Sequence, residues 1–352
     1  MKAVVLEQNE VLSYREMPTP APGANEVLIK VAVCGICGSD VPRVYDHAAR
    51  SYPMVLGHEF SGVVEQIGEH VSSVKVGDHV VAAPLIPCME CVDCKNGNYA
   101  LCQHYSFVGS RQQGAMADYV VVPAENVVPI SADVPFDQAA TIEPATVALH
   151  ALYHAKFEAG TNVVVLGCGI IGLYTIQWAK LLGAASVTAI GRGQKGLEAA
   201  AKLGADRCFS TKEVSEEELL KKLEPRGYDY VIESSGATQT IQLSLKLVAK
   251  KGTVCLIGTP KTEMTFSVSL WEQINRKECR VTGSWMSYSA PFPGKEWTAS
   301  VDAMTNGALL YLPGMFDQTY PMGSAKEAFD SIRSGKSKGR VLLSNILEEG
   351  KE

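Results

Sequence analysis

No apolar run in this sequence approaches the roughly 20 residues that an α-helix needs to cross a bilayer. Basic residues are not in excess either. The chain has 32 Lys and Arg against 38 Asp and Glu, and the net charge of −6 disfavours nucleic acid or an anionic membrane as a partner. Residues 7–10 are acidic or carry amides where a signal peptide would continue apolar, so we expect a cytoplasmic protein. The 352 residues are enough for two domains.

Cysteine, in contrast, is frequent, with ten residues in the chain. Disulfides are rare in the cytosol, so clustered cysteines there predict metal ligands. Four of them lie close together. Cys88, Cys91 and Cys94 form a C-x-x-C-x-x-C pattern, and Cys102 follows eight residues after it. Four thiolates complete a tetrahedral shell, which predicts a structural zinc in a lobe at about residues 86–104. An iron–sulfur cluster is the alternative, but the long gap to Cys102 and the lack of a proline after it argue against one.

A second group of metal-binding side chains comes earlier in the chain. Cys34 and Cys37 lie in one glycine-flanked segment, and His58 and Glu59 lie in another about twenty residues later. Thiol, imidazole and carboxylate are the ligands of catalytic zinc sites that keep an open position. The alternative is a buried cysteine and a hydrogen-bonded core histidine.

Glu143 stands just before Pro144, at the predicted start of a helix. It is a candidate third protein ligand for the same zinc, and its alternative role is simple charge pairing with the helix N-terminus. The segments before it, residues 1–83, contain short Val- and Ile-rich runs separated by proline and glycine. This spacing predicts a barrel-like or sandwich β domain.

A dinucleotide-binding motif follows in the middle of the chain. The buried run at residues 163–166 predicts a strand, and an amphipathic helix is predicted to end near Leu182. Between them lies the G-x-G-x-x-G sequence, composed of Gly167, Gly169, Ile170, Ile171 and Gly172. Its glycines allow a tight turn and close approach of the pyrophosphate, and the helix N-terminus supplies N–H groups to the phosphates. We therefore predict a βαβ nucleotide fold.

The residue at the end of the next predicted strand bears on which dinucleotide binds. NAD-binding chains carry a carboxylate there that accepts the ribose hydroxyls. This chain has Gly191 instead, with Arg192 and Lys195 close by. The pattern favours NADP(H) over NAD(H), because a carboxylate would repel the 2′-phosphate. The alternative is that both cations are solvated loop residues. Arg340, at the entry of a terminal strand beside Lys338, is a further candidate for the cofactor phosphates, again with a solvated position as the alternative.

Together these motifs resemble those of the zinc-containing medium-chain alcohol dehydrogenases, over essentially the whole chain. The resemblance implies an α/β architecture with two domains. One is a GroES-like β-barrel catalytic domain at residues 1–146 and 288–352, and the other is a Rossmann doubly wound parallel-sheet coenzyme domain at 147–287. It also implies a homodimer or a tetramer, and an active site in the cleft between the domains.

The family further implies a catalytic zinc held by Cys37, His58 and Glu143, with Glu59 as an exchangeable ligand or a neighbour of the ligands. It implies two Zn²⁺ per chain, one catalytic and one structural. Zinc would act as a Lewis acid on an alcohol that transfers hydride to the nicotinamide. Ser39 is placed to accept the alcohol proton.

Within the family the chain resembles enzymes of sugar-alcohol phosphates, and it departs from other members at two positions. Pro42 replaces a histidine that often relays a proton, and Gly191 replaces an aspartate. A phosphorylated substrate would need a cation, for which Arg43 and Arg111 are candidates. A dehydrogenase of unphosphorylated polyols or secondary alcohols, of the sorbitol or butanediol type, is the alternative enzyme. A non-catalytic dinucleotide-binding redox sensor is a different class, which the full set of zinc ligands disfavours.

Overall fold

The computed structural model describes residues 1–337 and 339–349, so Lys338 lies outside the described residues. The chain divides into two units. Unit 1 comprises Met1–Glu143, Tyr288–Gly307 and Phe316–Glu352, and unit 2 comprises Pro144–Ser287 and Ala308–Met315. Among the residues described, no helix is long and apolar enough to cross a membrane.

The sequence placed 308–315 with the catalytic domain, whereas the structure includes this stretch in unit 2. The physical reason is a pair of hydrogen bonds to a helix of that unit. The Leu310 N–H donates to Gln177 Oε1 at 2.7 Å, and Gln177 Nε2 donates to the Leu310 carbonyl at 3.2 Å. A spacing pattern carries no signal for such a return of the chain.

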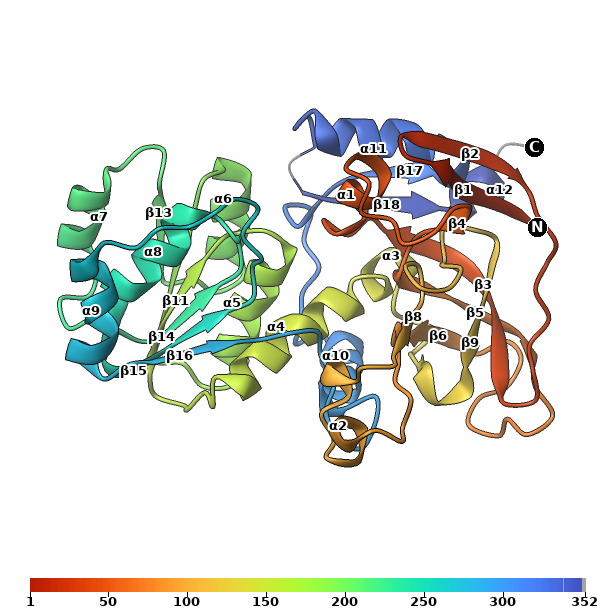
Figure 1. Cartoon of the computed structure of the whole chain (residues 1–352), viewed down its shortest axis with the longest axis horizontal. Helices are drawn as coiled ribbons and strands as arrows, with labels where there is room; N and C mark the ends of the chain where they lie inside the picture. The colour runs from red at the N-terminus through yellow and green to blue at the C-terminus, as the bar shows by residue number, and fades with distance from the viewer. Residues whose placement is uncertain (338, 350–352) are drawn as a thin grey trace. The chain divides into compact units, whose positions relative to one another are not determined.

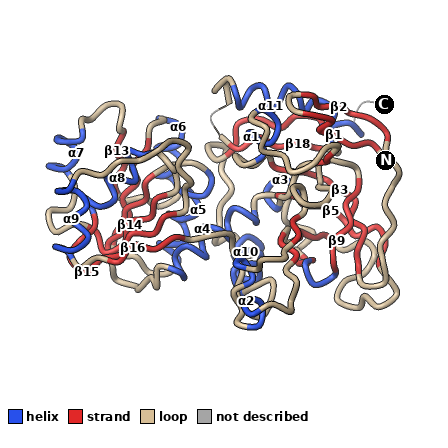
Figure 2. The backbone as a smooth tube through the Cα atoms, viewed as in Figure 1, coloured by secondary structure: helices blue, strands red, loops and turns tan. Residues whose placement is uncertain are grey.

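Unit 1 is built around β-sheets, whose strands Figure 2 draws in red. A seven-stranded sheet has the order β10-β6-β5-β3-β18-β17, with β9 also paired to β3; a three-stranded sheet has the order β2-β1-β4, and β7 pairs with β8. The strands are β1 (Lys2–Gln8), β2 (Val11–Glu16), β3 (Glu26–Gly35), β4 (Met54–Val55), β5 (Glu59–Ile67), β6 (His79–Ala82), β7 (Leu85–Ile86), β8 (Ser106–Phe107), β9 (Tyr119–Pro123), β10 (Val127–Pro129), β17 (Phe316–Pro321) and β18 (Arg340–Ser344).

The helices of unit 1 are short and lie between or after these strands. They are α1 (Asp40–Tyr45), α2 (Val92–Lys95), α3 (Phe136–Ala139), α10 (Lys295–Thr305), α11 (Ala325–Arg333), α12 (Ile346–Glu349) and the 3₁₀ turns η1 (Tyr99–Leu101), η2 (Ala124–Asn126) and η3 (Met322–Ser324). One apolar cluster joins both larger sheets to α11 and contains Leu6, Ile29, Phe60, Met116 and Phe329, all buried. β3 lies at the centre because its Val- and Ile-rich sequence is buried on both faces.

Unit 2 is a six-stranded parallel sheet with helices around it (Figure 1). Its strand order is β13-β12-β11-β14-β15-β16, that of a doubly wound nucleotide fold. The strands are β11 (Asn162–Leu166), β12 (Ser186–Gly191), β13 (Arg207–Ser210), β14 (Tyr228–Glu233), β15 (Val248–Leu256) and β16 (Arg280–Gly283). The helices are α4 (Ile142–His154), which starts in unit 1, α5 (Ile170–Leu181), α6 (Gln194–Lys202), α7 (Glu216–Lys222), α8 (Thr238–Leu247) and α9 (Val268–Lys277).

Side-chain alternation along the strands explains why helices cover both faces of this sheet. Val164 and Val231 on one face pack with Leu219, Leu243 and Leu270 from α7, α8 and α9. Cys255 points to the other face, where its thiol donates to a backbone carbonyl of α4 at 3.6 Å. Both faces of the sheet are therefore buried, as parallel sheets require.

Candidate metal and dinucleotide sites

The structure brings Cys37, His58 and Glu59 together, with one ligand atom of each within 4.8 Å of the others. The pairing of two strands causes this. β3 and β5 run antiparallel with Gly35 opposite Glu59, so the loop after β3 meets the start of β5. Cys37 lies in that loop, while His58 directly precedes β5 and Glu59 begins it. Two segments that the sequence separated by about twenty residues thus form one site.

Glycines leave the space that this cluster needs. A Cβ atom at position 35 would lie 2.8 Å from Glu59 Oε2. At Gly57, which has a φ of +96°, a Cβ would lie 2.6 Å from Cys34 Sγ and 2.8 Å from Met116. A positive φ disfavours any other residue there. Cys34 is fully buried in the apolar cluster of unit 1, so its role is packing.

Asp40 is completely buried and organises the loop that carries Cys37. Its Oδ2 accepts the Cys37 N–H at 3.1 Å, and its Oδ1 accepts Arg43 Nη1 at 2.7 Å. Oδ1 also lies 3.7 Å from His58 Nδ1, which is too far for a hydrogen bond. The Ser39 N–H points to Cys37 Sγ at 3.5 Å, a contact that favours a thiolate. Asp40 thus positions the thiol and places a negative charge beside the imidazole.

Arg340 is buried in unit 1 against this cluster. Its Nη1 donates to the Ile36 carbonyl at 2.7 Å and lies 3.0 Å from Glu59 Oε2, in an ion pair whose side chains are 6% and 1% exposed. The sequence placed Arg340 at the cofactor phosphates. The structure corrects its surroundings, because its described partners lie at the metal cluster, while a contact with the cofactor stays a prediction. No spacing pattern relates Arg340 to Glu59; only the pairing of β18 with β3 does so.

Glu143 is outside the group of three whose ligand atoms lie within 4.8 Å of one another, although the sequence assigned it as a ligand. It is nevertheless close enough to be affected by that group. Burial, and next the negative charge of Glu59, raise the pKa of its carboxyl to about 7. Burial, followed by Glu59 and Asp40, likewise raises the pKa of the Cys37 thiol. The third protein ligand, Glu59 or Glu143, therefore stays a prediction.

The donor set fits a zinc ion. The Cys37 thiol and the Glu143 carboxyl both have raised pKa values, because of burial and in part because of the nearby charge of Glu59, and a divalent cation would relieve this repulsion. His58 Nδ1 is buried and has no hydrogen-bond partner in the described part of the chain. Buried nitrogen without a partner is costly unless it binds something. Thiolate, imidazole and carboxylate are the chemistry that zinc takes.

The remaining residues predicted for substrate chemistry lie in two places. Ser39 is exposed just before α1, and its Oγ accepts Arg43 Nη1 at 3.0 Å. Arg43 is therefore near the cluster and bound to two of its neighbours. Arg111 donates to the Tyr105 carbonyl at 3.0 Å, and its guanidinium stacks 3.8 Å from the centre of the Tyr105 ring. Phe107, four residues before Arg111, has its ring centroid 5.4 Å from that of His58 in an edge-to-face arrangement.

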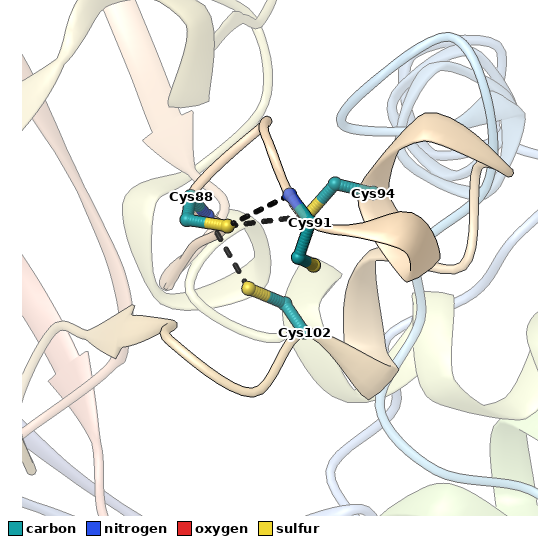
Figure 3. A group of neighbouring side chains, drawn as sticks. All are labelled: Cys88, Cys91, Cys94 and Cys102. Carbon is teal, nitrogen blue, oxygen red and sulfur yellow. Dashed lines mark hydrogen bonds between the residues drawn. The ribbon is translucent and has the colours of Figure 1, made fainter.

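The four clustered cysteines form a second group whose sulfur atoms lie within 4.8 Å of one another (Figure 3). Cys88 Sγ and Cys94 Sγ are 4.0 Å apart. Four sulfurs at about 2.3 Å from zinc in a tetrahedron would be about 3.8 Å apart, so the group fits the ion. Backbone N–H groups of Cys88 and Cys91 point to the sulfurs of Cys102 and Cys88 at 3.3 and 3.4 Å.

Local structure explains how these cysteines converge. β7 and β8 pair and bring the two ends of the lobe together. Between them, α2 carries Cys94, and η1 ends next to Cys102. The backbone N–H of Cys94 is the main cause that lowers the pKa of Cys91 to about 6, whereas burial raises the pKa of Cys94 to about 12. All four ligand positions are protein sulfurs, so the group has no open position for a substrate.

The predicted dinucleotide motif lies between β11 and α5 of unit 2. Gly167 has a φ of +104°, which a tight turn from strand to helix requires. A Cβ at Gly169 would meet open space as far as the described residues reach, and Ile170 and Ile171 begin α5. The helix N-terminus is therefore accessible to an anion. These residues fit a dinucleotide pyrophosphate.

Gly191 ends β12, while Arg192 and Lys195 are exposed at the start of α6. A hydrogen-bond network at the carboxyl end of β14, two strands away in the same sheet, escaped the sequence reasoning. Glu233 is fully buried. Its Oε1 accepts two hydrogen bonds from Ser235, one from the backbone N–H at 3.0 Å and one from the side-chain hydroxyl at 2.6 Å. The sequence signal that could have revealed this network is a carboxylate directly before two serines at the end of a predicted strand. It shapes the loop over the sheet edge where dinucleotides bind.

Known proteins resemble nearly the whole length of the chain. Residues 23–132 match the alcohol dehydrogenase GroES-like domain, and residues 171–306 match the zinc-binding dehydrogenase domain. Galactitol 1-phosphate 5-dehydrogenase of Escherichia coli K12 is 37% identical over 345 residues, covering 97% of this chain and 99% of that protein. A sorbitol dehydrogenase of Halalkalibacterium halodurans is 33% identical over 352 residues, covering 98% and 100%.

Solved structures show the same likeness. The crystal structure of galactitol-1-phosphate dehydrogenase from Escherichia coli superposes with a TM-score of 0.92 at 36% identity, covering 98% of this chain and 100% of that chain. A protein of Sinorhizobium meliloti 1021, described as a zinc-binding dehydrogenase and solved bound to NADP, has a TM-score of 0.88 at 28% identity. That superposition covers 97% of this chain and 98% of that one.

Proposed function

The chain belongs to the zinc-binding alcohol and polyol dehydrogenases, a family of oxidoreductases, and we propose that it oxidises a secondary hydroxyl of a sugar-alcohol phosphate with NADP as hydride acceptor. The reaction would be reversible and of the type that converts galactitol 1-phosphate to tagatose 6-phosphate. The observation that supports it most is the joint presence of the Cys37–His58–Glu59 cluster and the dinucleotide motif. Its cytoplasmic location stays a prediction.

The residues of this chain divide the chemistry between them. Zinc bound there would supply Lewis acidity that lowers the pKa of a substrate hydroxyl, and the nicotinamide would take the hydride. Cys37, His58 and either Glu59 or Glu143 would hold the ion. Asp40 keeps the thiol loop in place, and Arg340 balances the charge of Glu59.

Ser39 is the residue we propose for the first proton transfer. Its Oγ is exposed and accepts one hydrogen bond, from Arg43 at 3.0 Å. A hydroxyl oxygen has two lone pairs, so one remains for the substrate proton while its own hydrogen passes to solvent. Pro42 offers no imidazole for a longer relay, so the path to solvent through Ser39 is short.

Phosphate specificity is the finer part of the proposal. Arg43 supports it, because one edge of its guanidinium is bound to Ser39 and Asp40 close to the cluster, and its side chain is 20% exposed. A fixed guanidinium is well suited to a phosphate group. The similarity to a sorbitol dehydrogenase keeps unphosphorylated polyols as the second candidate function.

A panel of free and phosphorylated hexitols, each assayed with NAD and NADP on zinc-loaded protein, tests the function. We expect the highest kcat/KM with a hexitol phosphate and NADP. In the same panel, Arg43→Ala should raise KM for the phosphorylated hexitol about tenfold more than for the free hexitol, because one charge-assisted hydrogen bond is lost. Loss of the contacts to Ser39 and Asp40 affects both substrates and cancels in this comparison.

Arg15→Ala is the matched control, since Arg15 is exposed and pairs with Glu7 on the three-stranded sheet. It should leave both KM values unchanged. Equal effects of Arg43→Ala on the two substrates would remove Arg43 from the phosphate site. Absence of zinc-dependent turnover with every polyol would favour the non-catalytic redox sensor instead.

We also propose that the protein is a homodimer, with a tetramer as the alternative, and the edge of the parallel sheet supports this. β16 is the last strand of the sheet, and Val281 on it is 40% exposed. Trp271 and Trp285 nearby in sequence are exposed as well. An exposed apolar edge strand is a template for pairing with a second copy.

Val281→Lys should therefore shift the protein from dimer to monomer, because a lysine at an edge strand opposes pairing. Sedimentation velocity across a range of protein concentrations measures the effect. Val11→Lys, at an exposed valine of unit 1, is the control and should leave the mass unchanged. A dimer that survives Val281→Lys at the lowest concentration would exclude this edge as the contact.

A further inference from the structure

Cys168 occupies the space that a side chain at Gly191 would need. A Cβ built on Gly191 would lie 2.8 Å from Cys168 Sγ and 3.2 Å from its Cβ, and 3.4 Å from Leu197. Gly191 ends β12 in strand conformation, so its backbone would accept other residues. The main obstacle to a side chain there is thus the middle residue of the G-x-G turn.

A second glycine, Gly196, also lies close to Cys168. A Cβ at Gly196, in the first turn of α6, would lie 2.7 Å from the Cys168 carbonyl oxygen and 3.1 Å from its Cβ. Cys168 is therefore packed between the end of β12 and the start of α6. Of the two cations favoured for a 2′-phosphate, Arg192 lies in the turn between these elements and Lys195 in the first turn of α6.

We propose that Cys168 is a specificity-determining residue that keeps position 191 free of a carboxylate and so selects NADP(H). The carboxylate of NAD-binding chains projects from the end of this strand to accept the ribose hydroxyls. Here the thiol fills the start of that path. Burial raises the pKa of the Cys168 thiol to about 12, so it stays neutral and adds no charge beside Arg192. The inference rests on the proposed use of NADP.

A consequence is that residues 168 and 191 act as a pair. Gly191→Asp alone forces the new Cβ against Cys168 Sγ and displaces the turn that binds the pyrophosphate. It should weaken NADPH binding without gaining NADH binding. Cys168→Ala removes the sulfur and leaves the 3.2 Å contact with Cβ, which a small shift relieves, and the ordinary 3.4 Å contact with Leu197. The double variant Cys168→Ala/Gly191→Asp should then bind NADH about tenfold more tightly than Gly191→Asp does.

Nicotinamide fluorescence titrations with NADPH and NADH on the wild type, both single variants and the double variant measure this coupling. The control is Cys208→Ala/Gly191→Asp. Cys208 is also a half-buried thiol of this sheet, on the neighbouring strand β13, but it is not among the three atoms nearest to a Cβ at Gly191. This control should bind both nucleotides as Gly191→Asp does. Thermal unfolding of each protein reports whether it is folded, and Cys168→Ala should also restore any unfolding temperature lost in Gly191→Asp.

Each outcome of these titrations supports or overturns the role of Cys168 in cofactor selection. If Gly191→Asp binds NADH as tightly as the double variant, or if the Cys208 control rescues equally well, Cys168 does not select the cofactor. A double variant that recovers neither folding nor NADH binding also overturns the proposal. If the wild type itself prefers NADH, the proposed cofactor fails, but the difference between Gly191→Asp and the double variant still tests the steric pairing independently.

Discussion

We expect Cys37→Ser to lower kcat/KM for polyol oxidation on the order of a thousandfold and to remove one of the two zinc equivalents. The Lewis acid contributes several kcal/mol to the transition state, and a serine hydroxyl at position 37 is a far weaker ligand than a thiolate. The other equivalent stays, because the four sulfurs of the second group lie in a lobe closed by its own strand pair. Metal analysis by mass spectrometry and steady-state kinetics measure both effects.

Cys34→Ala is the matched control, three residues earlier on the same segment. Cys34 is buried against Gly57 in the apolar cluster, so its loss leaves a small cavity and costs some stability without removing a ligand. Both zinc equivalents and most of the activity should remain. Two zinc equivalents with full activity in Cys37→Ser would refute the ligand assignment. If Cys34→Ala lost one zinc equivalent and Cys37→Ser did not, the thiol ligand would be Cys34 and the assignment to Cys37 would be wrong.

The second large effect concerns stability. Cys94→Ser should remove the structural zinc and lower the unfolding temperature on the order of 10 °C, because metal binding and the folding of such a lobe are coupled. Cys94 is one of the two buried members of the group, and its Sγ lies 4.0 Å from Cys88 Sγ. Calorimetry and metal analysis of the same sample measure the loss, and limited proteolysis should cut first at residues 86–104.

Cys279→Ser is the control, since Cys279 is half-buried in unit 2 and belongs to neither metal group. It should change neither the zinc content nor the proteolysis pattern. An unfolding temperature of Cys94→Ser equal to that of the wild type, with the zinc lost, would mean that the ion does not stabilise the fold. Visible absorption typical of an iron–sulfur cluster in the wild type would overturn the zinc assignment itself.

The fold class could be predicted from the sequence, because regular patterns specified its parts. The family and its GroES-like and parallel-sheet architecture are confirmed. Glycine spacing after a buried valine run located β11 and α5, since only that turn needs three glycines in this order. The return of 308–315 to unit 2 could not be predicted, because two hydrogen bonds of Gln177 create it and no periodicity encodes them.

The candidate sites divide in the same way. Cysteine spacing specifies the four-sulfur group, since ligands that lie so close along the chain can reach one metal ion without any long-range strand pairing. The sequence also singled out Cys37, His58 and Glu59, but the burial of Arg340 beside Glu59 comes from strand pairing. The contact between Cys168 and Gly191 is equally invisible in sequence, because a glycine pattern says nothing about which side chain occupies the space it leaves.

The position of Arg340 also fixes when the metal site is finished during synthesis. Arg340 bonds the Ile36 carbonyl, 304 residues earlier, and is the buried counter-ion of Glu59. A ribosome adding about 5–20 residues per second needs roughly 15 to 60 s to travel that far. Until then β3 lacks its partner β18, and Glu59 lacks its guanidinium. Glu59 therefore stays without its buried counter-ion for most of the translation of the chain, and the Cys37–His58–Glu59 cluster has all its neighbours only after β18 has been made.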